Sequence, residues 1–316
     1  MTEPLAIFRA LADSTRLRIV ALLRAMELSV GELAQVLGQS QPRVSRHVKI
    51  LCDAGVAERR KEGSWVFVAL GRRAVTAPVL GALDAWELAG DPWVVADQAR
   101  LAAVRADRAS AAESWFEANA GQWDAIRSLH VAESEVEAAM AAALGEGSLG
   151  TLVDIGTGTG RMLELFGPRS AQALGVDRSS EMLRLARAKL ADLGHAELRQ
   201  ADLYALPLPD GAADTAILHH VLHFAQQPAA AIGEASRVLG PGGRLLIVDF
   251  APHEREELRT RDAHARLGFS DEQMLGWFER AGLAPVQVQT LEGGALTVKL
   301  WLGRKTGEVA EKVKAA

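Results

Sequence analysis

The sequence predicts a two-domain protein, in which an α+β winged helix-turn-helix domain precedes an α/β domain with a doubly wound, Rossmann-like parallel sheet. Three observations predict this class. The chain has 316 residues, enough for two hydrophobic cores at about 150 residues per domain. Residues 29–53 contain two helix patterns joined by a tight turn. From residue 151 onward, strands alternate with helices around a glycine-rich loop.

The composition favours an ordinary globular protein. Apolar residues make up 49% and charged residues 24%, which argues against a disordered or fibrous chain. The single cysteine, Cys52, cannot form an internal disulfide. Charged residues interrupt the amino terminus, and no uncharged run reaches the roughly 18 residues of a membrane span. We therefore expect a soluble, cytoplasmic protein without a membrane segment.

The net charge of −5 is unevenly distributed along the chain. Residues 1–90 contain 12 Lys and Arg against 9 Asp and Glu, a net charge of +3, and the remainder has a net charge of −8. This asymmetry favours a basic, partner-binding domain joined to an acidic one.

The two early helices are recognised by their ends. Ser29 and Glu32 form a capping box, and Gly38 ends the first helix. Ser40 and Pro42 open the second. Its apolar face consists of Val44, Val48, Leu51 and Cys52. We expect Cys52 to be a small core residue.

The opposite face of the second helix is polar. Its residues at helical spacing are Arg43, Arg46, His47 and Ile50, with Gln41 and Ser45 beside them. Arginine pairs with guanine and glutamine with adenine in the major groove, so this face is a candidate for reading DNA bases. The alternative is a solvated face of an ordinary small domain.

A basic hairpin follows. The segment VAERRKEGSWVFVAL predicts two strands around a turn at 62–64, with Arg59, Arg60 and Lys61 at the tip. Such a wing would contact phosphates and position the protein on DNA.

Residues 3–72 closely resemble the ArsR-type winged-helix repressors, through the segments ALADSTRLRIVALL and ELSVGELAQVLGQSQPRVSRHVKILCDAGVAERRKEGSWVFVAL. The resemblance implies a winged-helix domain over 1–90, a double-stranded DNA operator and a homodimer. Many members of the family sense metals through cysteines in the first helix of the motif or through His and Asp near the end of the domain. Ser29 and Val30 replace those cysteines, and residues 74–90 contain no histidine.

A helical connector joins the two domains. Asp91 and Pro92 form a helix start, and no helix breaker interrupts 93–118. A lone helix cannot bury its apolar residues, so we expect 91–112 to pack against a second copy or the next domain. A further helix is predicted over 134–144.

The carboxyl-terminal domain begins with a buried strand at 151–155 and the loop Gly156-Thr157-Gly158-Thr159-Gly160. Arg161 stands where a dinucleotide-binding fingerprint needs glycine, which argues against NAD. A second strand at 171–176 ends at Asp177, whose carboxylate can accept from ribose hydroxyls. Strands at 215–218 and 244–248 complete a parallel sheet with its ligand at the carboxyl ends of the strands.

Residues 113–303 resemble class I S-adenosylmethionine-dependent methyltransferases, through AESWFEANAGQWDAIRSLH, VDIGTGTGRMLELF, GVDRSSEML, RQADLYALPLPDGAADTAILHHVLHF and RVLGPGGRLLIVDF. The resemblance implies that S-adenosylmethionine or S-adenosylhomocysteine is bound by Asp154, Gly156, Gly158, Gly160, Asp177, Met182, Asp202, Leu203 and His219. It also implies an antiparallel hairpin from 285–289 and 296–302. We expect a charged tail at 304–316.

Five histidines fall within 46 residues: His219, His220, His223, His253 and His264. They can act as general bases, substrate contacts or metal ligands, or lie on a helix face or in solvent. No pair has the spacing of a known zinc motif, so we expect no metal site. His219, at a strand end, is the candidate catalytic residue, although methyl transfer needs mainly positioning. One cysteine is too few for an arsenite methyltransferase.

Two functions remain open. The first is a transcriptional regulator, a repressor, whose small-molecule signal is S-adenosylmethionine or S-adenosylhomocysteine. The resemblance of the whole chain to ArsR–methyltransferase fusions makes methionine-cycle genes the leading candidate targets. The second is an active small-molecule methyltransferase whose DNA-binding domain controls its own operon.

Overall fold

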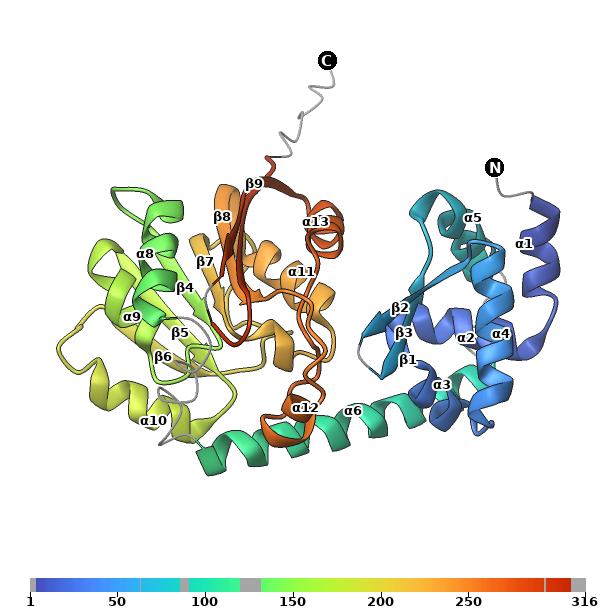
Figure 1. Ribbon diagram of the computed structural model, residues 1–316. Coiled ribbons are helices and arrows are strands. Elements are labelled where there is room, and N and C mark those ends of the chain that lie inside the picture. Colours follow the sequence, from blue (N-terminus) through green and yellow to red (C-terminus); the bar gives the residue numbers. More distant parts are fainter. Residues whose placement is uncertain (1–3, 63, 86–90, 120–131, 293, 308–316) are drawn as a thin grey trace, which may run out of the picture. The chain divides into compact units, whose positions relative to one another are not determined.

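A computed structural model describes residues 4–62, 64–85, 91–119, 132–292 and 294–307. The chain divides into two compact units, Met1–Ala111 and Ala112–Ala316 (Figure 1). Within the described residues, no helix combines the length and the apolar character needed to cross a membrane.

The first unit is a winged helix-turn-helix. Its three-stranded sheet has the order β1-β3-β2, and both strand pairs are antiparallel. The elements are α1 (Pro4–Leu11), α2 (Ser14–Ala25), β1 (Leu28–Ser29), α3 (Val30–Leu37), α4 (Gln41–Asp53), β2 (Ala57–Glu62), β3 (Trp65–Leu70), α5 (Arg73–Ala85) and the first turns of α6 (Pro92–Asn119).

Local sequence explains the helix-turn-helix. The hydroxyl of Ser29 accepts from the N–H of Glu32, whose carboxylate accepts from the N–H of Ser29, which completes the expected capping box. Gly38 ends α3 at a φ of 65°, a conformation that favours glycine. Ser40 is the N-cap of α4, as expected, although its side chain makes no cap hydrogen bond. The apolar faces of α2, α3 and α4 meet in one core, against which Cys52 packs.

An ion pair connects the start of α6 to α2 of the winged helix. Arg18 on α2 donates to both carboxylate oxygens of Asp97, over 2.6 and 2.7 Å. Arg100 donates to the same carboxylate and to the carbonyl of Val36 at the end of α3, each over 2.6 Å. The guanidinium of Arg18 also lies 5.2 Å from the ring centroid of Trp93. The first turns of α6 are therefore part of the first unit.

The second unit has a seven-stranded sheet of order β6-β5-β4-β7-β8-β10-β9. Strands β6 to β8 are parallel, and β10 and β9 add an antiparallel hairpin. The elements are α8 (Glu133–Leu144), β4 (Thr151–Ile155), α9 (Arg161–Phe166), η3 (Gly167–Arg169), β5 (Gln172–Asp177), α10 (Ser180–Lys189), β6 (Ala196–Gln200), β7 (Ala213–His219), η4 (Leu222–Phe224), α11 (Pro228–Val238), β8 (Leu239–Phe250), α12 (Glu257–Arg261), α13 (Asp271–Arg280), β9 (Leu283–Leu291) and β10 (Val298–Lys305).

Side chains alternate between the two faces of this sheet, as the pleat of a strand requires. On β8, Leu245 and Ile247 join one core with α11 and α13, whereas Leu246 and Val248 join another with α8 and α9. The sheet therefore lies between two helical layers (Figure 1), which is the doubly wound fold that the sequence predicts.

The structure corrects two expectations about this unit. Strand β6 was not predicted, because its sequence AELRQ has only two apolar residues at alternate positions, Ala196 and Leu198, which is too short an alternation to indicate a strand. The charged tail was expected to begin at residue 304, but β10 runs to Lys305. The ammonium group of Lys305 donates to the carbonyls of Ser236 and Leu239. Residues 308–316 lie outside the described residues, as does 120–131 of the segment that resembles methyltransferases.

Candidate functional sites

Helix α4 presents a polar surface on the side opposite the core. Gln41, Arg43 and Arg46 are exposed, and Ser45 is half-buried. Ile50 on the same side is 41% exposed. Since the buried face of α4 is fixed by Val44, Val48 and Leu51, packing of the unit keeps the arginines on its surface.

His47 departs from the expected face. Its side chain is only 14% exposed, and Nδ1 lies 3.6 Å from Oδ1 of Asp13, the N-cap of α2. Burial lowers the pKa of His47, and the carboxylate of Asp13 opposes that shift. The His47 side chain therefore faces Asp13 within the first unit and not the outside of α4. The sequence placed it on the outward face.

The basic hairpin also differs from its expected form. Arg59, Arg60 and Lys61 lie within β2, paired with Val68, Phe67 and Val66 of β3, and not at the tip. Alternation along the strand separates the three side chains. Arg59 and Lys61 are exposed, whereas the guanidinium of Arg60 lies 3.2 Å from the carboxylate of Glu27. Two of the three basic side chains are thus available to a phosphate.

The glycine loop of the second unit connects β4 to α9. The N–H groups of Gly156 and Thr157 both donate to the carbonyl of Val176 on β5, over 2.7 and 2.9 Å. A Cβ on Gly156 would lie 2.5 Å from Val221, and one on Gly160 would lie 2.8 Å from Leu190. Both residues also have a positive φ, 75° and 84°, which favours glycine there whatever the loop binds.

Gly158 is tied to the end of β5 instead. Its N–H donates over 2.8 Å to Oδ2 of Asp177, and the N–H of Ser179 donates over 2.8 Å to Oδ1. Burial raises the pKa of Asp177, and these backbone donors oppose the rise. The carboxylate predicted for ribose is thus held by two amides at the carboxyl end of β5, next to the glycine loop.

Four other expected cofactor residues lie in or just after the strands and helix next to this loop. Asp154 is buried at the end of β4 and accepts from the hydroxyl of Thr157 over 2.6 Å. Asp202 accepts from the N–H of Tyr204 over 3.0 Å and is followed by half-buried Leu203. Met182, in the first turns of α10, is buried. Asp154 lies near the end of β4 and Asp202 comes two residues after β6, and the carboxyl ends of these parallel strands share one edge of the sheet.

The histidine cluster lies at the carboxyl ends of β7 and β8. His219, His220, His223 and His264 are all buried, and Phe250 lies among them. A helix face was the alternative for His220 and His223, and solvent exposure was the alternative for His253. His220 lies outside any helix, between β7 and η4, with a φ of 54°. His223 lies buried in the short helix η4, and His253 is half-buried and not fully exposed. A non-glycine residue at such a φ costs about 1–3 kcal/mol and is found preferentially at functional sites.

The structure adds a residue that the sequence reasoning missed. Asp249 on β8 is fully buried, and its Oδ1 lies 2.8 Å from Nδ1 of His223. Burial raises the pKa of Asp249 to about 6, while the charge of His220 and the N–H groups of Phe250 and His223 lower it. An acidic residue inside the apolar run LLIVDF was the signal that could have indicated it.

Comparisons with known proteins identify both units. A family model described as bacterial regulatory protein, arsR family, matches residues 13–59, and one described as methyltransferase domain matches 153–247. The chain is 39% identical over 106 residues to the arsenic resistance transcriptional regulator ArsR1 of Pseudomonas putida, which is 32% of this chain and 79% of that protein.

The chain is also 33% identical over 178 residues to the ubiquinone/menaquinone biosynthesis C-methyltransferase UbiE of Syntrophotalea carbinolica, 47% of this chain and 75% of that protein. A methyltransferase of Haloferax volcanii, solved with a methyltransferase activator, shares the fold with a TM-score of 0.53 at 20% identity, over 61% of this chain and 98% of that one. The chain spans only 30% to 63% of the length of four other curated relatives. Each of these similarities therefore covers one domain of this chain and not its whole length.

Proposed function

We propose a function from the premise that this chain joins an arsR-family regulatory domain to a class I methyltransferase domain and so belongs to both families. It is a transcriptional regulator, a repressor, that binds double-stranded operator DNA through α4 and β2. Its methyltransferase domain binds S-adenosylmethionine or S-adenosylhomocysteine as the signal. Methionine-cycle genes are the leading candidate targets.

One observation carries this proposal. Helix α6 starts in the first unit, where Arg100 bonds the carbonyl of Val36 at the end of α3, and the same helix continues past Ala111. A single continuous helix is thus attached directly to the helix-turn-helix and leads into the methyltransferase domain. Ligand-dependent displacement of α6 would act on the turn that positions α4.

The proposal includes a homodimer. Leu5 and Phe8 on α1 are 54% and 67% exposed, and Trp93 and Val95 on α6 are 63% and 54% exposed. Apolar side chains exposed at this level on two helices of one unit favour burial against a second copy. A dimer would place two copies of α4 on two half-sites, whose spacing a ligand can change.

Titration of a protein–DNA complex with each ligand tests the proposal. The probe is a labelled duplex containing the region upstream of the protein's own gene, with a scrambled duplex as control. A coupling of about 1–3 kcal/mol changes operator affinity roughly 5- to 150-fold, and we expect unequal changes for the two ligands, since they differ by a methyl group and a charge. Asp177→Ala should remove the response, and Asp210→Ala, at an exposed carboxylate of the same unit, should keep it.

A second candidate function is supported by the buried histidines at the carboxyl edge of the sheet, where the ligands of such folds bind. In this alternative the chain is a working small-molecule methyltransferase, with His219 as a catalytic residue, and the winged helix controls its own operon. If both ligands bind the protein and neither changes operator affinity, the sensor proposal fails and the methyltransferase alternative is favoured.

Base reading and phosphate contact can be separated by two substitutions. Arg46→Ala should cost about 1–3 kcal/mol on the operator and relax specificity at one base pair, because an arginine on this face would pair with a base. Lys61→Ala should weaken binding to all sequences alike. Competition with scrambled DNA measures both effects, and Arg184→Ala in the second unit is the charge-matched control. Equal losses on both DNAs for Arg46→Ala contradict the base-reading role.

A further inference from the structure

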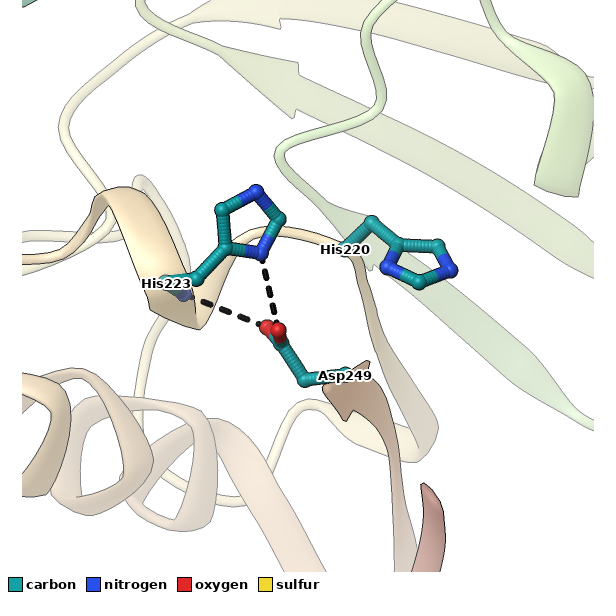
Figure 2. A group of neighbouring side chains, drawn as sticks. All are labelled: His220, His223 and Asp249. Carbon is teal, nitrogen blue, oxygen red and sulfur yellow. Dashed lines mark hydrogen bonds and ion pairs between the residues drawn. The ribbon is translucent and has the colours of Figure 1, made fainter. Parts of the chain in front are cut away.

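Three side chains lie close together at the carboxyl ends of β7 and β8. Each of His220, His223 and Asp249 offers a ligand atom, and these atoms all lie within 4.8 Å of one another (Figure 2). All three residues are buried, with 8%, 2% and 0% exposure. The two histidines are three residues apart, but the carboxylate comes 26 residues after His223, so spacing along the sequence does not reveal the set.

The separations fit a small cation. Two ligands about 2.1 Å from a tetrahedrally coordinated zinc ion lie about 3.4 Å apart. Nδ1 of His223 and Oδ1 of Asp249 are already 2.8 Å apart. His220 follows the end of β7, beside this pair (Figure 2), and its ligand atom lies within 4.8 Å of those of His223 and Asp249.

The backbone around the three side chains is firmly held. The carbonyl of His223 accepts from the N–H groups of Ala265 and Arg266, each over 2.9 Å. The carboxylate of Asp249 accepts from the N–H groups of Phe250 and His223, over 2.8 and 3.2 Å. The N–H of His220 donates to the carbonyl of Val248 over 2.8 Å. Ligands fixed in this way by surrounding hydrogen bonds need little rearrangement to bind an ion.

We propose that His220, His223 and Asp249 bind a divalent first-row transition-metal ion, with zinc as the simplest occupant. Imidazole with carboxylate favours such ions over Mg²⁺ and Ca²⁺, which prefer all-oxygen sites. A dication also compensates a carboxylate that is completely buried between two imidazoles. Three protein ligands leave at least one position for an oxygen or nitrogen atom of a small molecule. The proposal is independent of the function proposed above, because neither DNA binding nor methyl transfer enters it.

Cobalt(II) is the probe of choice, because its visible absorption reports the ligands around it. The titration uses the full chain carrying Cys52→Ser, which removes the only thiol. We expect one equivalent of cobalt per chain, displaced by zinc, without sulfur-to-metal absorption. Asp249→Asn and His220→Asn should each weaken binding at least tenfold. His195→Gln, a histidine elsewhere in the same unit that contacts the carbonyl of Gly167, should bind as the parent does.

The choice of variants guards against misfolding. Asparagine adopts positive φ more readily than most residues, so His220→Asn keeps the backbone at that position. Circular dichroism and thermal unfolding of the metal-free proteins show which variants are folded. The proposal is overturned if the parent binds no cobalt or zinc, or if folded His220→Asn binds them as tightly as the parent. In that event His223 and Asp249 form a simple hydrogen-bonded pair.

Discussion

Gly158→Val should reduce the affinity for S-adenosylmethionine at least 100-fold while the methyltransferase domain stays folded. The N–H of Gly158 is bonded to Asp177, so this residue lies where the glycine loop meets the proposed ribose carboxylate. Its φ is 53°, a conformation that a β-branched side chain strongly disfavours. Valine would therefore place branched carbons beside the ligand and move the amide off Asp177. Isothermal calorimetry measures the affinity.

A matched glycine separates binding from stability. Gly145 has a φ of 67°, and a Cβ there would meet no atom within 4 Å, so Gly145→Val brings backbone strain at a position outside the loop. We expect Gly145→Val to bind S-adenosylmethionine as the parent does. Unchanged affinity in a folded Gly158→Val protein would remove this loop from the binding site.

Asp97→Ala should destabilise the winged-helix unit by about 3 kcal/mol, the lower end of the range for breaking a buried ion pair. The Asp97 side chain is 3% exposed and that of Arg18 is 13% exposed. Removing the carboxylate leaves the guanidinium of Arg18 buried without its counter-ion, although Trp93 still lies over it. Native-state hydrogen exchange on peptides from α2 and α3 measures the loss locally, since the second unit has its own core.

The exposed pair of Arg24 and Asp84 provides the control. Both side chains are at least half exposed, and solvent screens their attraction. Asp84→Ala should leave exchange in α2 and α3 unchanged. If Asp84→Ala accelerates exchange in α2 and α3 as much as Asp97→Ala does, any loss of an ion pair destabilises the unit, and the buried pair has no special role.

The elements that the sequence predicts well are those specified by neighbouring residues. The capping box of α3 spans Ser29 to Glu32, and the loop from Gly156 to Gly160 follows a strand of continuous apolar residues. Their physical causes, a hydrogen bond across one turn and the burial of a strand on both faces, act over fewer than ten residues. Local sequence is sufficient for such features.

What the sequence could not supply depends on residues that are far apart along the chain. Arg60 is drawn away from the outward face of the wing by Glu27, 33 residues earlier. His47 faces Asp13, and His223 meets Asp249, through packing of separate elements. Strand β6 is specified by its pairing with β5, because its own side chains alternate too weakly to indicate a strand. In each case tertiary contact decides between orientations that the local pattern leaves open.

The two units have separate interiors. The apolar core of the first contains residues between Ala10 and Val104, those of the second contain residues between Val136 and Leu302, and no described residue belongs to both. In evolutionary terms, the two halves are portable. A joining of two genes can create such a chain without remodelling either interior. Under the proposed function, a change of ligand would require changes in the second interior and in α6, and none in the first core.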